Sequence, residues 1–155
     1  MRAIANGSTK VFIVHGHDKA VKESTIRFVE KLGLTPVVFD ESPNKGRTIV
    51  EKFEDLAADV VFAIVLFTPD DVGGKAARST KLQRRARQNV VFELGFFVGQ
   101  LGRDRVCLLH IADTEIPSDL HGVLYVPLDE HEGWHVRLAR EMKAAELSFD
   151  LNRIL

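Results

Sequence analysis

Two scarcities limit the classes of protein that this sequence can encode. It has one cysteine in 155 residues, so no intramolecular disulfide can form, and the apolar neighbours of Cys107 indicate a buried, inert thiol in a reducing compartment. Long hydrophobic runs are also missing, because the longest extends only from Val60 to Phe67 and no apolar signal segment lies near the N-terminus. We therefore expect a cytoplasmic chain with no membrane partner.

Neither sign of charge is in excess. The 21 Lys and Arg residues against 22 Asp and Glu give a net charge of -1, which argues against general affinity for nucleic acid. Few aromatic residues interrupt the basic stretch between residues 72 and 92, so it is a poor platform for stacking bases and could face a pyrophosphate, a nucleic-acid backbone or only solvent. That stretch contains no acid and six basic residues: Lys75, Arg78, Lys81, Arg84, Arg85 and Arg87.

Familiar nucleotide-binding and hydrolase motifs are absent as well. The sequence has no G-x-x-x-x-G-K-[ST] phosphate loop, no G-x-G-x-x-G after its first apolar run and no G-x-S-x-G elbow. His15, His17 and Asp18 could be interpreted as metal ligands, but Asp18 is well placed to cap a helix and no further ligand cluster accompanies them. We predict no metal and no cofactor.

Strand and helix patterns alternate along the chain. The unbroken apolar run at 60–67 is typical of a strand covered on both faces of a parallel sheet. A capping box at Thr48 to Glu51 predicts a helix that buries Ile49, Phe53 and Leu56. Amphipathic spacing predicts further helices after the first strand and near Trp134. The predicted strands are 10–14, 36–39, 60–67, 106–111 and 123–128.

These patterns predict an α/β fold, a flavodoxin-like doubly wound sheet of five parallel strands with helices on both faces. Residues 10–155 form the predicted domain, and residues 1–9 a tail or linker remnant. Ligands of such sheets bind beyond the carboxyl ends of the strands, which directs attention to 15–18, 40–47 and 68–89. The connection after Pro69, about twenty residues long, exceeds a routine link and is predicted to be functional or mobile.

Glu93 is the only charged residue between Asn89 and Gly102. A carboxylate in an apolar helix must be paired, hydrogen-bonded or protonated, because an isolated buried charge is costly. It is therefore either half of a structural ion pair with an upstream arginine or part of a functional site.

Glycines at 95, 99 and 102 lie on the same predicted helix as Glu93. We expect them to let the helix lie close to the sheet, the alternative being a close helix contact between subunits.

Three segments together resemble TIR domains, in particular the prokaryotic TIR-like group described as predicted nucleotide-binding proteins. Phe12-Ile-Val-His-Gly-His-Asp18 is similar to the first-strand box of that family, and Asp40 to Arg47 occupies the place of its BB loop. Arg85-Ala-Arg-Gln-Asn-Val-Val-Phe-Glu-Leu-Gly-Phe-Phe97 resembles its glutamate-bearing helix. One departure is that Asn89 stands where many TIR domains have tryptophan, so a base-stacking contact must come from elsewhere.

The resemblance implies an NAD+ hydrolase that cleaves the nicotinamide-ribose bond to give nicotinamide and ADP-ribose or its cyclic form. It places the catalytic carboxylate at Glu93, with NAD+ as substrate rather than cofactor. It further implies an oligomeric effector of prokaryotic anti-phage defence, with TIR-TIR contacts and a sensor domain or partner outside this chain. The candidate substrate-binding residues are His15, Gly16, Asn44, Arg47, Asp70, Arg87 and Asn89.

Two other functions remain open from the sequence. One is a non-catalytic TIR-like module that binds nucleotides or assembles with other TIR domains without consuming NAD+. The other is a related N-glycosidase that acts on nucleosides or nucleotides, with Glu93 in a similar role. Nicotinamide release separates the hydrolase from the module, and a panel of substrates separates it from the other glycosidase.

Overall fold

The computed structural model describes residues 7–39, 46 and 48–155. Two candidate site residues, Asn44 and Arg47, lie outside the described residues, as does most of the loop that resembles the BB loop. The structure therefore leaves the predictions for these two residues as predictions.

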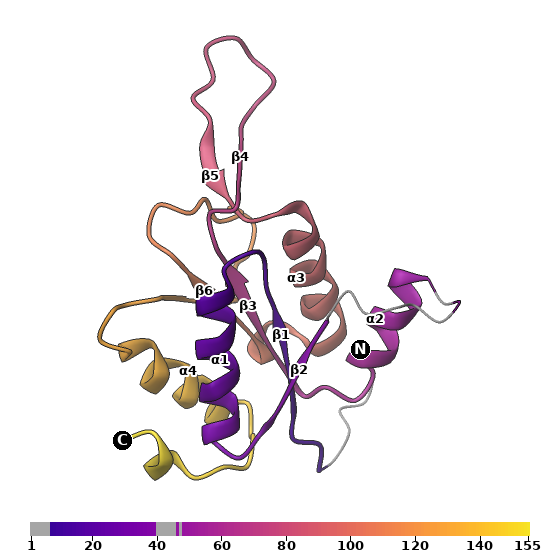
Figure 1. The fold of residues 1–155 in the computed structure, drawn as a ribbon, viewed down its shortest axis with the longest axis vertical. Helices are drawn as coiled ribbons and strands as arrows, with labels where there is room; N and C mark the ends of the chain where they lie inside the picture. Colours follow the sequence, from indigo (N-terminus) through magenta and orange to yellow (C-terminus); the bar gives the residue numbers. More distant parts are fainter. Residues whose placement is uncertain (1–6, 40–45, 47) are drawn as a thin grey trace.

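A single five-stranded parallel sheet forms the centre of the molecule (Figure 1). Its strand order, β2-β1-β3-β6-β7, is that of the flavodoxin-like fold, so the predicted fold class is confirmed. Every residue of β3 is buried, as expected for the central strand of a sheet covered on both faces. The strands are β1 (Lys10–Val14), β2 (Thr35–Val38), β3 (Phe62–Phe67), β6 (Val106–His110) and β7 (Leu124–Pro127).

Two helices cover each face of the sheet (Figure 1). On one face α1 (Lys19–Lys31) and α4 (Gly133–Ala144) share a core in which the rings of Phe28 and Trp134 lie 5.2 Å apart. On the other face lie α2 (Ile49–Ala57) and α3 (Gln88–Leu101). Short 3-10 helices follow at Arg103–Arg105 and Leu151–Arg153. The described part of the chain contains no helix with the length and apolar character needed to cross a bilayer.

Local sequence signals account for where the first two helices begin. The Asp18 carboxylate accepts a hydrogen bond from the Val21 N–H at 3.0 Å, which confirms its predicted capping role. Thr48 and Glu51 form the predicted capping box. The predicted burial of Ile49 is wrong, because this residue is 62% exposed in the first turn of α2, whereas Phe53, one turn later, is buried in the core.

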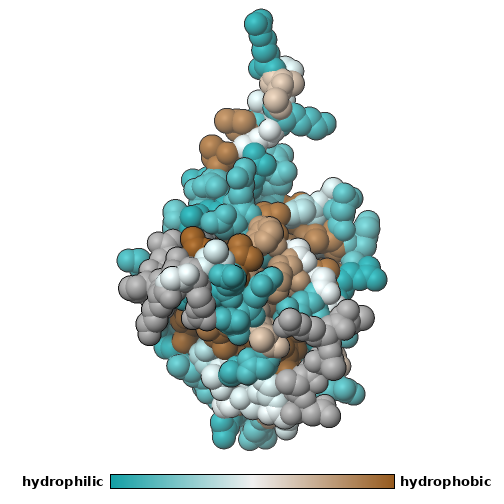
Figure 2. All heavy atoms as spheres, turned by 90° about the vertical axis from the view of Figure 1, so that its right-hand side faces the viewer, coloured by the Kyte–Doolittle hydropathy of each residue, from teal (hydrophilic) through white to brown (hydrophobic). Residues whose placement is uncertain are grey.

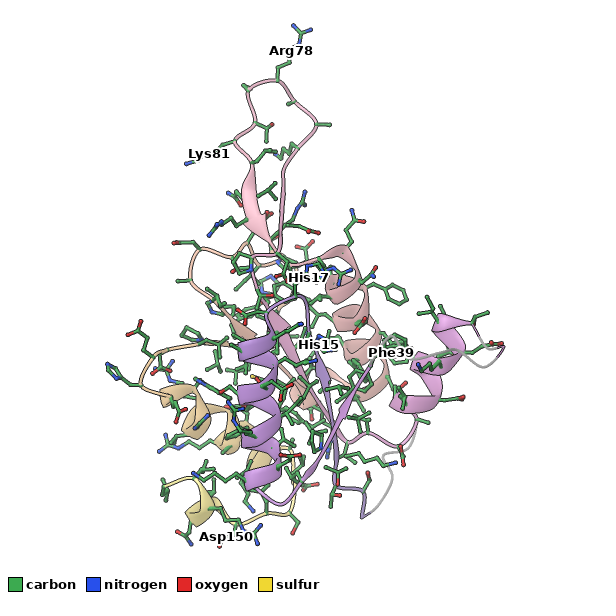
Figure 3. All side chains as sticks on the ribbon, in the orientation of Figure 1. His15, His17, Phe39, Arg78, Lys81 and Asp150 are labelled. Atoms are coloured by element: carbon green, nitrogen blue, oxygen red, sulfur yellow. The ribbon has the colours of Figure 1, made fainter. Side chains whose placement is uncertain are left out.

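A projecting hairpin, here called the arm (residues 71–85), occupies most of the long basic connection (Figure 1). Its strands β4 (Asp71–Gly73) and β5 (Gln83–Arg85) pair antiparallel, and the Glu115 N–H donates to the Arg84 carbonyl at 2.8 Å beneath it. Arg78 and Lys81 extend away from the body of the protein (Figure 3). The arm is mostly hydrophilic (Figure 2), although Val72 and Leu82 are exposed on it. Sequence patterns gave no indication of these two strands.

The glycines of α3 do not serve close packing on the sheet. A Cβ atom built at Gly95 or Gly99 would have no heavy atom within 4 Å, because both residues face outward. Contact with the sheet layer instead comes from Val90, Leu94 and Phe97 on the buried side of α3. The prediction that these glycines bring the helix close to the sheet is therefore wrong.

Candidate functional site

The loops that follow β1 and β3 meet at the carboxyl edge of the sheet. One oxygen of Asp70, Oδ2, accepts hydrogen bonds from the Thr68 hydroxyl at 2.5 Å and from the His17 backbone N–H at 3.2 Å. Thr68 is buried, so its hydroxyl fixes the carboxylate from beneath. Asp70 thus holds the loop after β1 in place. The sequence did not indicate this role, because it suggested Asp70 only as a candidate substrate-binding residue.

Gly16 is the residue that makes this contact sterically possible. An added Cβ would lie 3.1 Å from the Thr68 hydroxyl oxygen and only 2.0 Å from Asp70 Oδ2. The second distance is much shorter than a van der Waals contact, so the Cβ would collide with the carboxylate. Beside it, His15 Nδ1 lies 3.0 Å from the Gly16 carbonyl oxygen, which accepts a hydrogen bond when Nδ1 carries the proton. Both labelled histidines lie where β1 ends and α1 begins (Figure 3).

Glu93 lies on the side of α3 that faces α2. It shares this side with Phe96 and Gln100, three and seven residues further along the helix. The Phe96 ring lies 4.9 Å from that of Phe53 in α2, and Gln100 Nε2 donates to the Ala57 carbonyl at the end of α2 at 2.7 Å. Glu93 therefore faces the space between the two helices that cover this face of the sheet.

The Glu93 carboxyl group is half-buried and has no hydrogen-bond or ion-pair partner among the described residues. Burial raises its pKa to about 7, while the positive charge of Arg87 acts in the opposite direction. The structural ion pair with Arg84, Arg85 or Arg87 is thus not formed within the described part of the chain. Near neutral pH the group exchanges between a carboxylate and a carboxylic acid.

The N-terminus of α3 carries two further candidates. Arg87 is the N-cap residue and makes no side-chain capping bond, so the free N–H groups of the first turn have no side chain bound to them. Asn89 is exposed in that first turn. An uncapped helix N-terminus beside a guanidinium favours an anion, which is compatible with the predicted role of Arg87.

A cavity of about 740 Å³ opens between the base of the arm and the start of α3. Gln88 and Val91 of α3 line it, and they lie on the opposite side of the helix from Glu93, which is not among its lining residues. Asp70 lines the same cavity and also accepts a hydrogen bond from the His17 N–H. It therefore connects the cavity with the loop that follows β1. The sequence could not indicate this cavity, because the arm that forms one wall was not predicted.

The described residues contain no group of three or more His, Cys, Asp or Glu side chains that could hold a metal ion. Near His15 and His17, the Asp18 carboxylate is engaged in capping α1 and Asp70 Oδ2 accepts from the Thr68 hydroxyl and the His17 N–H.

The fold and a family match together give the class of protein. A five-stranded parallel sheet in this order, covered by helices on both faces, is consistent with the fold of a TIR domain. Residues 10–130 match the model of the family described as "CAP12/Pycsar effector protein, TIR domain". The chain belongs to this family, which confirms the resemblance found in the sequence.

Several known proteins are similar to this chain in sequence. The chain is 52% identical over 149 residues to the uncharacterized protein YuaY of Escherichia coli (strain K12), which covers 96% of this chain and 49% of YuaY. It is 36% identical over 140 residues to protein tirC of Dictyostelium discoideum, covering 83% of this chain and 70% of tirC. Pycsar effector protein PaPycTIR of Pseudomonas aeruginosa is 40% identical over 76 residues, 48% of this chain and 24% of that protein. The chain spans about half the length of YuaY.

Proposed function

We propose that the chain is an NAD+ hydrolase that cleaves the nicotinamide-ribose bond, with Glu93 as the catalytic carboxylate. The observation that carries the proposal is the half-buried Glu93 carboxyl group, which has no partner among the described residues and lies in the second turn of α3. This helix follows the carboxyl ends of the strands, where ligands of doubly wound folds bind. Membership of a TIR effector family supports the same activity.

A single carboxylate suffices for this reaction. In NAD+ the glycosidic nitrogen belongs to a pyridinium cation, so the bonding electron pair leaves with a neutral nicotinamide and no general acid is required. The ribose carbon is left with oxocarbenium character, and a carboxylate beside the sugar stabilises that positive charge. Attack by water, with loss of one proton, gives ADP-ribose, whereas attack by a ring nitrogen of the adenine gives the cyclic product.

The protonation state of Glu93 links this mechanism to pH. Only the ionised carboxylate stabilises a cationic sugar, and burial raises the pKa of Glu93 to about 7. The rate of NAD+ cleavage is therefore expected to increase as the pH rises through 7.

The test of the proposal is nicotinamide release by the wild-type chain and by Glu93→Ala and Glu93→Gln at high protein concentration. We expect both variants to fold and to lose at least about a hundredfold in kcat, because removing a preorganised stabilising group typically costs about 3 kcal/mol or more. Glu54→Gln, on an exposed part of α2, is the matched control. Undetectable turnover by the wild type under every condition would favour the non-catalytic module.

The wider role rests on the family. We propose that the domain acts in the cytoplasm as an effector of anti-phage defence and that copies associate through TIR-TIR contacts. A sensor domain or partner protein would supply the activating signal. In this proposal the segment from Asp40 to Arg47, which contains Asn44, contributes to substrate binding together with His15 and Gly16.

A further inference from the structure

The cavity at the base of the arm has the size of a small-molecule site and a strongly charged lining. Its volume of about 740 Å³ falls within the roughly 300–1,000 Å³ typical of such sites. Apolar side chains, arginines and carboxylates all contribute to its wall, and those that matter here are Val72, Val91, Arg84, Arg85, Asp70 and Asp71.

The guanidinium of Arg85 is left available to a ligand. Asp71 is its direct cross-strand neighbour, yet the two form no ion pair in the part of the chain that the structure describes. The guanidinium lies across Gly73 instead, where an added Cβ would fall 1.2 Å from Nη2. The missing side chain at Gly73 thus creates the space in which Arg85 rests beside the cavity.

We propose that this cavity binds the ADP portion of the dinucleotide whose nicotinamide ribose reaches Glu93, an inference that rests on the proposed function. Arg84 and Arg85 contact the diphosphate, because guanidinium groups match phosphate oxygens in charge and geometry. Asp70 Oδ1, which is not used in holding the loop after β1, and the Asp71 carboxylate accept hydrogen bonds from ribose hydroxyls. Val72 and Val91 contact the adenine.

The start of α3 connects the cavity with Glu93. Gln88 lines the cavity and precedes Glu93 by five residues, which is about 7.5 Å along a helix axis. A dinucleotide that passes over the uncapped N-terminus of α3 can therefore contact the cavity on one side of the helix and Glu93 on the other side. Along this path the free N–H groups of the first turn and Arg87 meet the diphosphate.

Binding of ADP, AMP and adenosine to the Glu93→Gln variant, measured by calorimetry, tests the proposal without any turnover. We expect ADP to bind about tenfold more tightly than AMP, and adenosine more weakly still. Gly73→Ala, which displaces the guanidinium without changing the charge, and Arg85→Ala should each weaken ADP binding about tenfold or more, as expected for loss of a charged hydrogen bond. Gly95→Ala is the matched glycine control, because its added Cβ meets nothing within 4 Å, and it should bind ADP unchanged.

Competition identifies which molecule supplies the ADP group. NAD+ should displace ADP from the Glu93→Gln variant with one-to-one competition. Equal binding of ADP to the variants at Gly73 and Arg85 and to their parent, or binding of ADP and NAD+ together, would overturn the assignment. The wild type could fail to hydrolyse NAD+ while Gly73→Ala and Arg85→Ala still lose ADP binding and NAD+ still displaces ADP. That combination would reject the hydrolase and support the binding site.

Discussion

At the scale of single residues, Glu93 has a stability cost as well as a proposed role. Its carboxyl group is half-buried and has no partner in the part of the chain that the structure describes, and burial raises its pKa from 4.5 to about 7. The unfolded chain therefore ionises this group first as the pH rises. The contribution of this group to the free energy of unfolding is fully present below about pH 4.5. It is lost as the pH rises through 7, because the folded state keeps the proton to a higher pH than the unfolded chain does.

Glu93→Gln removes this titration, so we expect the variant to be more stable than the wild type at pH 8 and equally stable near pH 4. One pKa unit corresponds to about 1.4 kcal/mol. Because water reaches the half-buried group, we expect a gain of only about 1 to 2 kcal/mol at pH 8. Urea unfolding at both pH values measures it, and equal stability at pH 8 would show that the carboxylate has a stabilising contact.

Gly16 provides a second prediction at the residue scale. Gly16→Ala should destabilise the fold by about 1 to 3 kcal/mol, because its Cβ would collide with the Asp70 carboxylate. The same substitution in an Asp70→Ala background should cost much less, since the colliding atoms are gone. A double-mutant cycle of unfolding free energies gives the coupling. Additive losses would mean that the two residues do not interact.

At the scale of elements, the N-terminus of α3 determines how Arg87 acts. Arg87 precedes Glu93 by six residues and forms no ion pair with it within the described residues, yet its charge still influences the carboxyl group. We expect Arg87→Ala to raise the KM for NAD+ several-fold with a smaller change in kcat, as for a residue that binds ground and transition states equally. Steady-state kinetics measures both constants.

Arg137→Ala, on an exposed part of α4 and on the other face of the sheet, is the control and should leave KM unchanged. A lower kcat with unchanged KM in Arg87→Ala would instead show that Arg87 acts through Glu93.

Sequence patterns predicted the elements that bury apolar surface and missed those that do not. The five strands of the sheet and the caps at Asp18 and Thr48 were recognisable from apolar runs and short-range hydrogen bonding. Strands β4 and β5 have three residues each, and most of their side chains are exposed, so no alternation reveals them. The cavity and the position of the Arg85 guanidinium across Gly73 depend on that hairpin, so the sequence did not predict them either.

The candidate site was predictable only in part, for a related reason. Glu93 was found because a lone charge in an apolar helix is visible in the sequence. The hydrogen bond between Asp70 and the His17 N–H joins residues 53 positions apart and involves a backbone group, so residue types alone do not reveal it. Gly95 and Gly99 show that the spacing of glycines along a helix does not indicate which neighbour they face.

At the scale of the whole molecule, the proposed TIR-TIR contacts predict that activity depends on protein concentration. If the segment from Asp40 to Arg47 of one copy completes or orders the site of its neighbour, dilution should lower the specific activity. We expect the total rate of nicotinamide release to rise more than linearly with protein concentration across a hundredfold series, followed in parallel by light scattering. Constant specific activity over that range would contradict association as a requirement for catalysis.

The buried position of Cys107 has a practical consequence. Its side chain is inaccessible in β6 and burial raises its pKa to about 12, so a thiol-reactive reagent meets almost no thiolate on the folded protein. Since the chain has no other cysteine, Ser79→Cys at the exposed end of the arm would create a single reactive position. A fluorophore attached there would report nucleotides and neighbouring copies that approach the arm, with the native thiol left in place.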